Sequence, residues 1–291
     1  MYGTTKKVAA IHDLSGFGRA SLTAIIPTLS AMGIQVCPVP TAILSNHTGG
    51  FEKYSYVDLT DSMEEYISVW KELGLTFDCI YSGFLGSTKQ ISIVTDFIDY
   101  FGTEDNLVVV DPVRGDHGSL YSSFTESIIP VMRRLVQKAD LITPNFTEAA
   151  FLLGKKECPE SLTDDEAREW LLKLAEFGPQ IVVITSVPDN EHKENTNVIA
   201  YDKKSNMFWK VGCRYIPAAY PGTGDTFTSV VIGSLLQNDS LPVALDRGMQ
   251  FISQCIKASY GFDYPKRNGV LLEKELGILN MPVLISGYEM L

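Results

Sequence analysis

Residues 107–116 read LVVVDPVRGD, a short apolar run that ends in an aspartate followed by a turn. The run Leu107–Val110 shows no alternation of polar and apolar residues, which is typical of a strand buried on both faces, as in a parallel sheet. Similar runs occur along the chain at Val8–Ile11, Val36–Val39, Cys79–Tyr81, Leu141–Ile142 and Ile181–Ile184. We therefore expect a central sheet that is mainly parallel.

Segments of helical period alternate with these strands. Helices are expected within Met63–Leu73, Ala167–Phe177, Thr226–Leu236 and Pro242–Ser259. Ile199–Tyr201 and Met207–Val211 are expected to pair as a hairpin, and the polar stretch 189–197 to form a surface loop. Because no linker rich in proline, glycine or serine divides the chain, residues 1–291 are expected to form a single α/β domain with helices on both faces of the sheet.

Composition and charge exclude several classes of protein. The 291 residues are 45% hydrophobic and 20% charged, which is ordinary for a globular protein with a buried core. The net charge of −11, without a run of Lys or Arg, argues against a nucleic-acid partner. The five cysteines form no CxxC pair or Cys/His cluster, so neither a zinc site nor a disulfide framework is expected. With no signal-peptide pattern and no membrane-spanning run, a cytoplasmic location is expected.

The stretch PGTGDTF, residues 221–227, is the most informative one for chemistry. Its glycines, Gly222 and Gly224, form a turn before an apolar helical run. Such a turn presents unpaired N–H groups and the positive end of the helix dipole, which suit a phosphate or a developing anion. Asp225 lies at the same helix start. From these residues alone it is either an N-cap or a functional carboxylate, and both interpretations stay open.

Asp111 follows the buried run Leu107–Val110 directly. Ligands of open α/β sheets bind outside the carboxyl ends of the strands, so Asp111 lies where a ligand or a metal ion is expected. The alternative is an ordinary Asp-Pro turn.

Asn145 and Glu148 follow the next strand with the spacing of a variant capping box. Thr163 and Glu166 have the same spacing and are predicted to be only a cap. Because the first box follows a buried strand directly, Glu148 is either a cap, a group close to a metal–phosphate complex, or both.

Residues 12–21, HDLSGFGRAS, resemble a dinucleotide-binding fingerprint, but Ser21 stands where the third glycine or alanine is required. The later ribose-binding acid is also missing, so an NAD-dependent oxidoreductase is a weak alternative. His12 is expected to be a packed, hydrogen-bonded core residue. The loop SNHTGG, residues 45–50, offers small polar groups. The chain has neither a G-x-x-x-x-G-K-[ST] stretch nor the motif set of protein kinases.

Taken in order, seven segments resemble the pyridoxal kinase branch of the ribokinase superfamily: IHDLSGFGRASL, ILSNHTGG, IYSGFLGS, VVVDPVRGD, ITPNFTE, VVITS and PGTGD. They run from residue 11 to residue 225. The resemblance implies a ribokinase-like fold and ATP-dependent phosphorylation of the 5′-hydroxymethyl group of a B6 vitamer (pyridoxal, pyridoxamine or pyridoxine). It also implies Mg²⁺, leaves room for a monovalent cation such as K⁺, and implies a homodimer.

The resemblance assigns catalytic roles to the PGTGD segment. Asp225 matches the base that takes the proton from the substrate hydroxymethyl group. Gly222, Thr223 and Gly224 match the anion hole around the transferring phosphoryl group.

For the nucleotide and its metal ion, Glu148 matches a glutamate tied to Mg²⁺ and Asp111 an aspartate near the γ-phosphate and cation. Asp116 is placed in the surroundings of the cations. Asn145 and the pair Thr185–Ser186 match residues beside the nucleotide phosphates.

On the substrate side, Thr48 matches a threonine that contacts the substrate, and Phe84 stands where a ring-stacking aromatic residue is usual. The serine that contacts the pyridine ring in many relatives has two competing equivalents, Asp13 and Ser15. A hydroxymethylpyrimidine or sugar kinase, and a noncatalytic B6-binding protein on the same scaffold, remain as alternatives.

Overall fold

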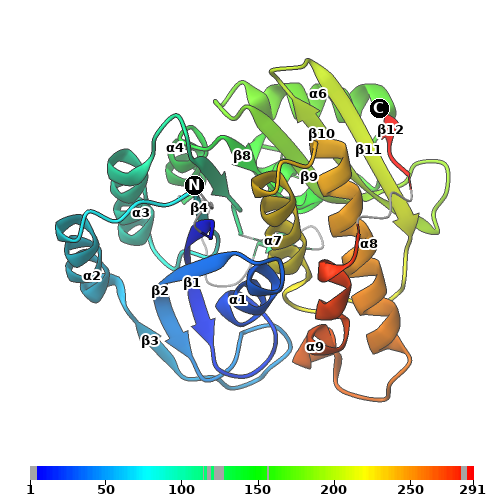
Figure 1. Cartoon of the computed structure of the whole chain (residues 1–291). Coiled ribbons are helices and arrows are strands. Elements are labelled where there is room, and N and C mark those ends of the chain that lie inside the picture. Colours follow the sequence, from blue (N-terminus) through cyan, green and yellow to red (C-terminus); the bar gives the residue numbers. More distant parts are fainter. Residues whose placement is uncertain (1–4, 114, 117–118, 121–127, 156, 283–286) are drawn as a thin grey trace.

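A ten-stranded sheet passes through the whole molecule (Figure 1). The computed structural model describes residues 5–113, 115–116, 119–120, 128–155, 157–282 and 287–291. In spatial order the strands are β12 (Glu289–Met290), β11 (Met207–Arg214), β10 (Asn195–Asp202), β9 (Ile181–Pro188), β8 (Leu141–Ile142), β5 (Leu107–Val110), β4 (Cys79–Ser82), β1 (Lys7–Ser15), β2 (Gln35–Leu44) and β3 (Tyr56–Asp58). A separate two-stranded sheet pairs β6 (Gly115–Asp116) with β7 (Ser119–Leu120).

The central strands are parallel and the outer ones are not. From β9 through β8, β5, β4 and β1 to β2, every neighbouring pair is parallel. The strands β10, β11 and β12 extend one side of the sheet in antiparallel fashion, and β3 closes the other edge in the same way. The predicted mainly parallel sheet is therefore confirmed.

Helices cover both faces of the sheet, as predicted. One face carries α1 (Leu22–Ala31), α7 (Thr223–Leu236) and α8 (Leu241–Tyr260). The other carries α2 (Thr60–Glu72), α3 (Thr88–Phe101), α4 (Ile129–Val136), α5 (Phe146–Leu152) and α6 (Asp164–Ala175). The short α9 (Leu272–Glu275) lies between the 3₁₀ turns Lys266–Asn268 and Leu276–Asn280.

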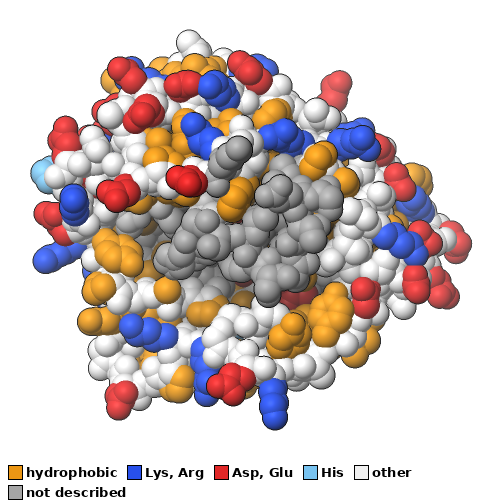
Figure 2. All heavy atoms as spheres, turned by 180° about the vertical axis from the view of Figure 1, so that it is seen from behind, with side chains coloured by type: hydrophobic (Ala, Val, Ile, Leu, Met, Phe, Trp, Pro, Cys, Tyr) orange, Lys and Arg blue, Asp and Glu red, His pale blue; other side chains and the backbone are white. Residues whose placement is uncertain are grey.

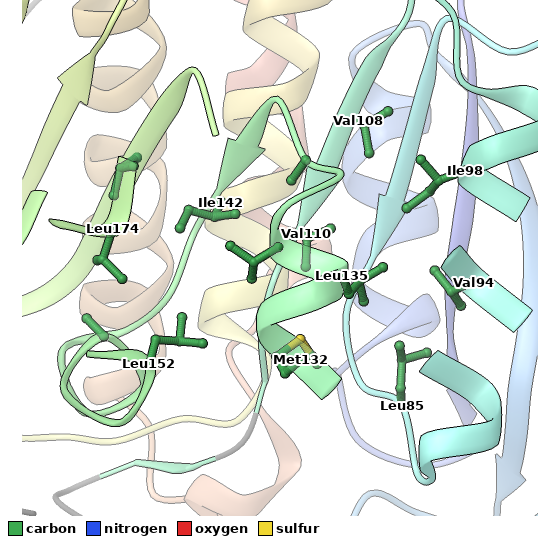
Figure 3. Close-up of a cluster of buried hydrophobic side chains, with 14 of the residues drawn as sticks. Leu85, Val94, Ile98, Val108, Val110, Met132, Leu135, Ile142, Leu152 and Leu174 are labelled. Atoms are coloured by element: carbon green, nitrogen blue, oxygen red, sulfur yellow. The ribbon is translucent and has the colours of Figure 1, made fainter. Parts of the chain in front are cut away.

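Alternate residues of each central strand enter opposite cores. Val108 and Val110 of β5 pack into the core under α2–α6, whereas Val109 packs into the core under α1, α7 and α8. Figure 3 shows the first core, where Val110 lies among side chains such as Met132 and Leu135 of α4. Burying one such side chain fully contributes about 1.5–3 kcal/mol, so strands that are apolar on both faces stabilise this three-layer arrangement.

Most predicted elements are confirmed, with one correction in the stretch 189–197. The hairpin forms between β10 and β11, but β10 begins at Asn195, so the predicted loop is shorter than expected. Asn197 is buried there and donates to the Asp189 carboxylate, which explains how so polar a stretch enters the sheet. Strand β3 has only three residues, all of them exposed, and so short a run was not predicted from the sequence.

The charged side chains on the surface are of both signs. Acidic and basic side chains are interspersed on the face shown in Figure 2, where Lys and Arg do not gather into a patch. All five cysteines are free. Among the described residues, no helix is long and apolar enough to cross a membrane.

Candidate active site

The predicted site residues converge at the carboxyl ends of the central parallel strands. Asp111 follows β5, and its carboxylate interacts electrostatically with Glu148 of α5 and Asp225 of α7. Asn145 forms an isolated parallel bridge with Thr185 of β9. The sheet thus places these five residues at one edge, where ligands of open α/β sheets bind.

The start of α7 is shaped by two glycines with different surroundings. Gly222 is the N-cap residue with φ of 78°, and a Cβ there would lie 2.0 Å from the Arg19 carbonyl oxygen, so only glycine fits. Gly224 is exposed, and a Cβ there would meet nothing within 4 Å. Gly222 therefore shapes the turn, whereas Gly224 leaves open space beside the helix N-terminus.

Asp225 is not the N-cap, so the cap-only interpretation is wrong. It is the third residue of α7, and its Oδ2 accepts a hydrogen bond of 2.8 Å from the backbone N–H of Ser21. Burial raises the pKa of Asp225 to about 6; the Ser21 N–H opposes this rise, and the negative charge of Asp13 adds to it. A carboxylate with such a pKa is mostly ionised at neutral pH and still basic enough to accept a proton.

Asp111 and Glu148 form a buried acidic pair. They are 6% and 4% exposed. Burial raises the pKa of Asp111 well above its usual range, and the charges of Glu148 and then Asp225 add to the rise. A cation between these carboxylates would relieve the repulsion, and Mg²⁺ commonly uses one or two carboxylates together with water and substrate phosphates.

Glu148 is also a helix cap, so the two interpretations of this residue are compatible. Its Oε2 accepts from the Asn145 N–H and the Asn145 side chain accepts from the Glu148 N–H, both at 2.9 Å. Gly115 of β6 donates to Glu148 Oε1 at 3.4 Å and accepts from Asn145 Nδ2 at 2.8 Å. The capping box of Thr163 and Glu166 forms as predicted.

The predicted third acidic group, Asp116, has its backbone in β6, but its side chain lies outside the described residues. Within the described part of the chain, no group of three or more His, Cys, Asp or Glu residues is arranged to hold a metal ion. Asp111 and Glu148, which are buried and interact with each other, supply two carboxylates toward a metal ion.

A cavity of about 590 Å³ opens beside the N-terminus of α7. Thr185, Ser186, Thr223 and Gly224 line its polar part, and its walls come from β10, β11 and α8. The size is within the range of pockets that bind small ligands. The predicted nucleotide residues of β9 and α7 thus face one cavity.

The residues predicted to contact the substrate lie at or after the ends of β1, β2 and β4. Ser15 is buried and donates to Asp13 Oδ2 at 2.9 Å, so the two candidates for contacting the ring are hydrogen-bonded to each other. Thr48 is exposed in its loop, and Phe84 is partly buried after β4. The neighbouring His47 is buried and lies 2.7 Å from the carbonyl oxygen of Arg267.

The expectation for His12 is half right. It is fully buried, but in the described part of the chain neither ring nitrogen has a hydrogen-bond partner. Burial lowers the pKa of His12 to about 3, so the ring is neutral. Its position fits packing: a Cβ on Gly83 would lie 2.3 Å from the ring.

Sequence reasoning missed the contacts that the C-terminal segment makes with this site. Arg19 forms an ion pair of 2.7 Å with Glu273, and the Arg267 guanidinium lies 5.0 Å from the ring centroid of Phe51. These partners are separated by more than 200 positions, so no local pattern announces them.

Known proteins are similar to this chain in sequence and in fold. The sequence profile of the family described as Phosphomethylpyrimidine kinase matches residues 16–270. A Bacteroides thetaiotaomicron protein provisionally described as a phosphomethylpyrimidine kinase, solved with pyridoxal, is 53% identical; the match covers 99% of this chain and 100% of that one, with a TM-score of 0.95.

Pyridoxal kinases are similar as well. The Lactobacillus plantarum pyridoxal kinase is 31% identical over 95% of this chain and 97% of its own, with a TM-score of 0.85. The human pyridoxal kinase is 27% identical over 80% of this chain and 81% of its own length. The family profile matches residues 16–270, which is most of the chain. The chain therefore belongs to the phosphomethylpyrimidine kinase family, and pyridoxal kinases are among its relatives.

Proposed function

We propose that this protein is a pyridoxal kinase, which transfers the γ-phosphoryl group of ATP to the 5′-hydroxymethyl group of a B6 vitamer. The observation that carries the proposal is the position of Asp225. It follows Gly224, which lines the cavity, and its carboxylate interacts with Asp111 of the acidic pair Asp111 and Glu148. The pyridoxal kinases among the relatives, and the similar protein solved with pyridoxal, support this choice of substrate.

Asp225 acts as the general base. The proton leaves the hydroxymethyl oxygen of the vitamer for the carboxylate as that oxygen attacks the γ-phosphorus, and ADP is the leaving group. A pKa of about 6 keeps Asp225 mostly ionised at neutral pH while leaving it a better proton acceptor than an ordinary aspartate. A positioned base of this kind contributes roughly 10²–10⁴-fold in rate.

The first turn of α7 stabilises the transferring group. Gly222, Thr223 and Gly224 supply backbone N–H groups at the positive end of the helix dipole, and the open space at Gly224 leaves room for phosphoryl oxygens. Fixed donors of this kind act on charge that develops in the transition state, which is the main requirement of phosphoryl transfer. Asn145 and the pair Thr185–Ser186 are proposed to contact the ATP phosphates.

Glu148 and Asp111 are proposed to hold Mg²⁺, either directly or through its water shell. The ion would neutralise charge on the ATP phosphates. The Gly115 N–H donates to Glu148 Oε1 and the Asn145 N–H to Oε2, so two backbone donors orient this carboxylate. Asp116 is proposed to lie near the metal ion, together with a monovalent cation such as K⁺.

Ser15, Thr48 and Phe84 are proposed to contact the vitamer ring, and residues 1–291 to act as one kinase domain. A homodimer is proposed from family resemblance, and light scattering of the purified protein tests it. A cytoplasmic location stays a prediction from the sequence.

The function is tested by ATP-dependent phosphorylation of pyridoxal, pyridoxamine, pyridoxine and hydroxymethylpyrimidine by one enzyme preparation. We expect turnover of at least one B6 vitamer with stoichiometric ADP release. Turnover of hydroxymethylpyrimidine alone would replace the proposed substrate class, and no ADP release with any of the four would contradict the proposal.

A further inference from the structure

Ser21 has a backbone conformation that side-chain-bearing residues rarely adopt. Its φ is 50° and its ψ is −134°, just before α1. Such conformations cost about 1–3 kcal/mol and persist only where the surrounding structure enforces them. Glycine would adopt this conformation at less cost, so the serine side chain is expected to have a use here.

Every polar group of Ser21 is engaged. Its carbonyl oxygen accepts from the N–H groups of Ala24 and Ile25, which begins α1. Its N–H donates to Asp225 Oδ2 at 2.8 Å, and its hydroxyl donates to Asp13 Oδ1 at 2.6 Å. The unusual backbone therefore lets one residue begin α1 and still bond to a carboxylate of α7.

The bond from Ser21 occupies only one oxygen of the proposed base. Among the described residues, no donor bonds to Asp225 Oδ1. A carboxylate fixed through Oδ2 cannot rotate freely, so Oδ1 keeps one direction toward a substrate. Positioning of this kind matters because a misplacement of 1 Å can lower the rate by about 10²-fold.

Asp13 supports Ser21 from the other side. It is 5% exposed, and its two oxygens accept from the hydroxyls of Ser15 and Ser21. Two hydroxyl donors satisfy the buried carboxylate, and the bond to Ser21 offsets part of the cost of its backbone.

We propose that Ser21 is a positioning residue: its N–H fixes one oxygen of Asp225 so that the other faces the vitamer hydroxyl, and Asp13 holds Ser21 in the conformation that this requires. The proposal rests on the proposed function, in which Asp225 is the general base.

Several charged and titratable groups around Asp225 influence its pKa, and a pH profile of kcat reports their combined effect. Within the described ranges, Asp225 interacts with the carboxylates of Asp13 in β1 and Asp111 after β5, and with Tyr81 of β4. His47 interacts with Asp13. A variant that alters only the Ser21 bond should therefore leave the other influences on Asp225 in place.

The test compares Ser21→Ala with Thr23→Ala. Thr23 lies in the same turn, but its hydroxyl bonds to the carbonyls of Gly18 and Ala20 rather than to an aspartate. Without the hydroxyl, Ser21 relaxes away from Asp225, so we expect kcat to fall roughly 10- to 100-fold while KM for ATP is unchanged. Because an N–H bond to the ionised carboxylate is lost, the acid limb of kcat moves to higher pH. Thr23→Ala should change neither kcat nor the acid limb.

Two Asp13 variants separate its support of Ser21 from its charge. Asp13→Asn keeps an oxygen acceptor for the Ser21 hydroxyl but removes the negative charge that raises the pKa of Asp225, so the acid limb of kcat moves to lower pH. Asp13→Ala removes the support, and adding it to Ser21→Ala should cost no further kcat, because the two act as one unit.

The outcomes distinguish the two proposals. A wild-type enzyme without vitamer kinase activity, or an active Asp225→Asn variant, would overturn the proposed function or its base. An inactive Asp225→Asn variant beside a Ser21→Ala variant with normal kcat and an unmoved acid limb would overturn the positioning role alone.

Discussion

The two proposed ends of the active site, one for the vitamer and one for the nucleotide, are built in opposite ways. The vitamer end, around Asp13 and Ser21, is a packed network of hydrogen bonds. The C-terminal segment adds to it through the contact of Arg267 with His47. The nucleotide end is a cavity of about 590 Å³ with walls from antiparallel strands and α8. The first end is filled by hydrogen-bonded side chains, whereas the second has room for a ligand.

This difference predicts where substitutions change rate and where they change affinity. Asp225 lies at the boundary, bonded to the vitamer-side network through Ser21 and one residue away from Gly224 at the cavity. Chemistry should therefore depend most on Asp225. The acidic pair Asp111 and Glu148, which is proposed to lie next to the ATP phosphates, should control the use of Mg·ATP. The exposed loop at Thr48 should affect the affinity for the vitamer.

The largest effect is expected for Asp225→Asn. It removes the base but keeps the size of the side chain, so kcat should fall by at least about 10²-fold, which corresponds to a barrier higher by about 2.7 kcal/mol. The melting temperature should equal or exceed that of the wild type, because the variant no longer carries a charge on a largely desolvated carboxyl group. Steady-state kinetics and thermal unfolding on one preparation measure both.

A matched control for this variant is Asp165→Asn. Asp165 lies in the first turn of α6 and is exposed. It should keep wild-type turnover. Near-normal turnover of Asp225→Asn would remove Asp225 from the mechanism and from its proposed place between the two ends of the site.

Glu148→Gln is expected to come next. Gln retains an oxygen that can accept the Asn145 N–H, so the cap survives, but the charge beside Asp111 is lost. The Mg²⁺ concentration for half-maximal activity should rise roughly 10- to 100-fold. Glu166→Gln, in the second capping box, is the matched control and should leave Mg²⁺ dependence unchanged. Equal Mg²⁺ dependence of both variants would reduce Glu148 to a helix cap.

The pH dependence follows from the raised pKa of Asp225. Asp225 must be ionised to accept a proton, so kcat/KM should fall as the pH drops through about 6. An unperturbed aspartate has a pKa of about 3.9 and would keep the rate nearly constant down to pH 5. A profile measured from pH 5 to 8, with ADP release as the readout, separates the two cases.

The two glycines of the turn should respond differently to alanine. At Gly222 the added methyl group collides with the Arg19 carbonyl and requires positive φ, so Gly222→Ala should lower the free energy of unfolding by at least about 1–3 kcal/mol. At Gly224 nothing is met, and alanine is about 0.5–1 kcal/mol more favourable within a helix, so stability should rise slightly.

Gly224→Ala should weaken the use of ATP even though it slightly raises stability. Gly224 lines the cavity where phosphoryl oxygens are proposed to bind, and an added methyl group would take up space there. KM for ATP should therefore rise, by about 10-fold if the loss is near 1.4 kcal/mol. A variant that is both more stable and fully active would show that Gly224 is not part of the anion hole.

The sequence predicts the layers of this fold well because buried parallel strands and capping boxes are local signals. Leu107–Val110 and the box of Asn145 and Glu148 are both confirmed. The strand–Asp motif likewise predicted that Asp111 faces the ligand edge. The position of Asp225 at the third residue of α7, rather than at the N-cap, depends on how Gly222 fits against Arg19, which no local pattern contains.

The vitamer end could not be predicted in the same way. Ser21 appeared only as a departure from a dinucleotide-binding pattern, because its bond to Asp225 spans 204 positions. Asp13 and Ser15 are two residues apart in β1, and their bond lies where the pairing of β1 with β2 shifts register near His12. Nonlocal contacts of this kind are fixed only when the sheet has formed.

The smallest effect is expected for Thr48→Ala, and it tests whether the exposed loop belongs to the vitamer end. Thr48 follows His47, which is held near the Arg267 carbonyl oxygen, so the loop has a fixed base while the Thr48 side chain stays accessible. A single neutral hydrogen bond contributes about 0.5–1.5 kcal/mol, so KM for the vitamer should rise about 3- to 10-fold. KM for ATP should not change, because the cavity at the other end does not include this loop. Titrating each substrate at saturating concentrations of the other measures the two constants separately. A rise in KM for ATP with an unchanged constant for the vitamer would move this loop to the nucleotide end of the site.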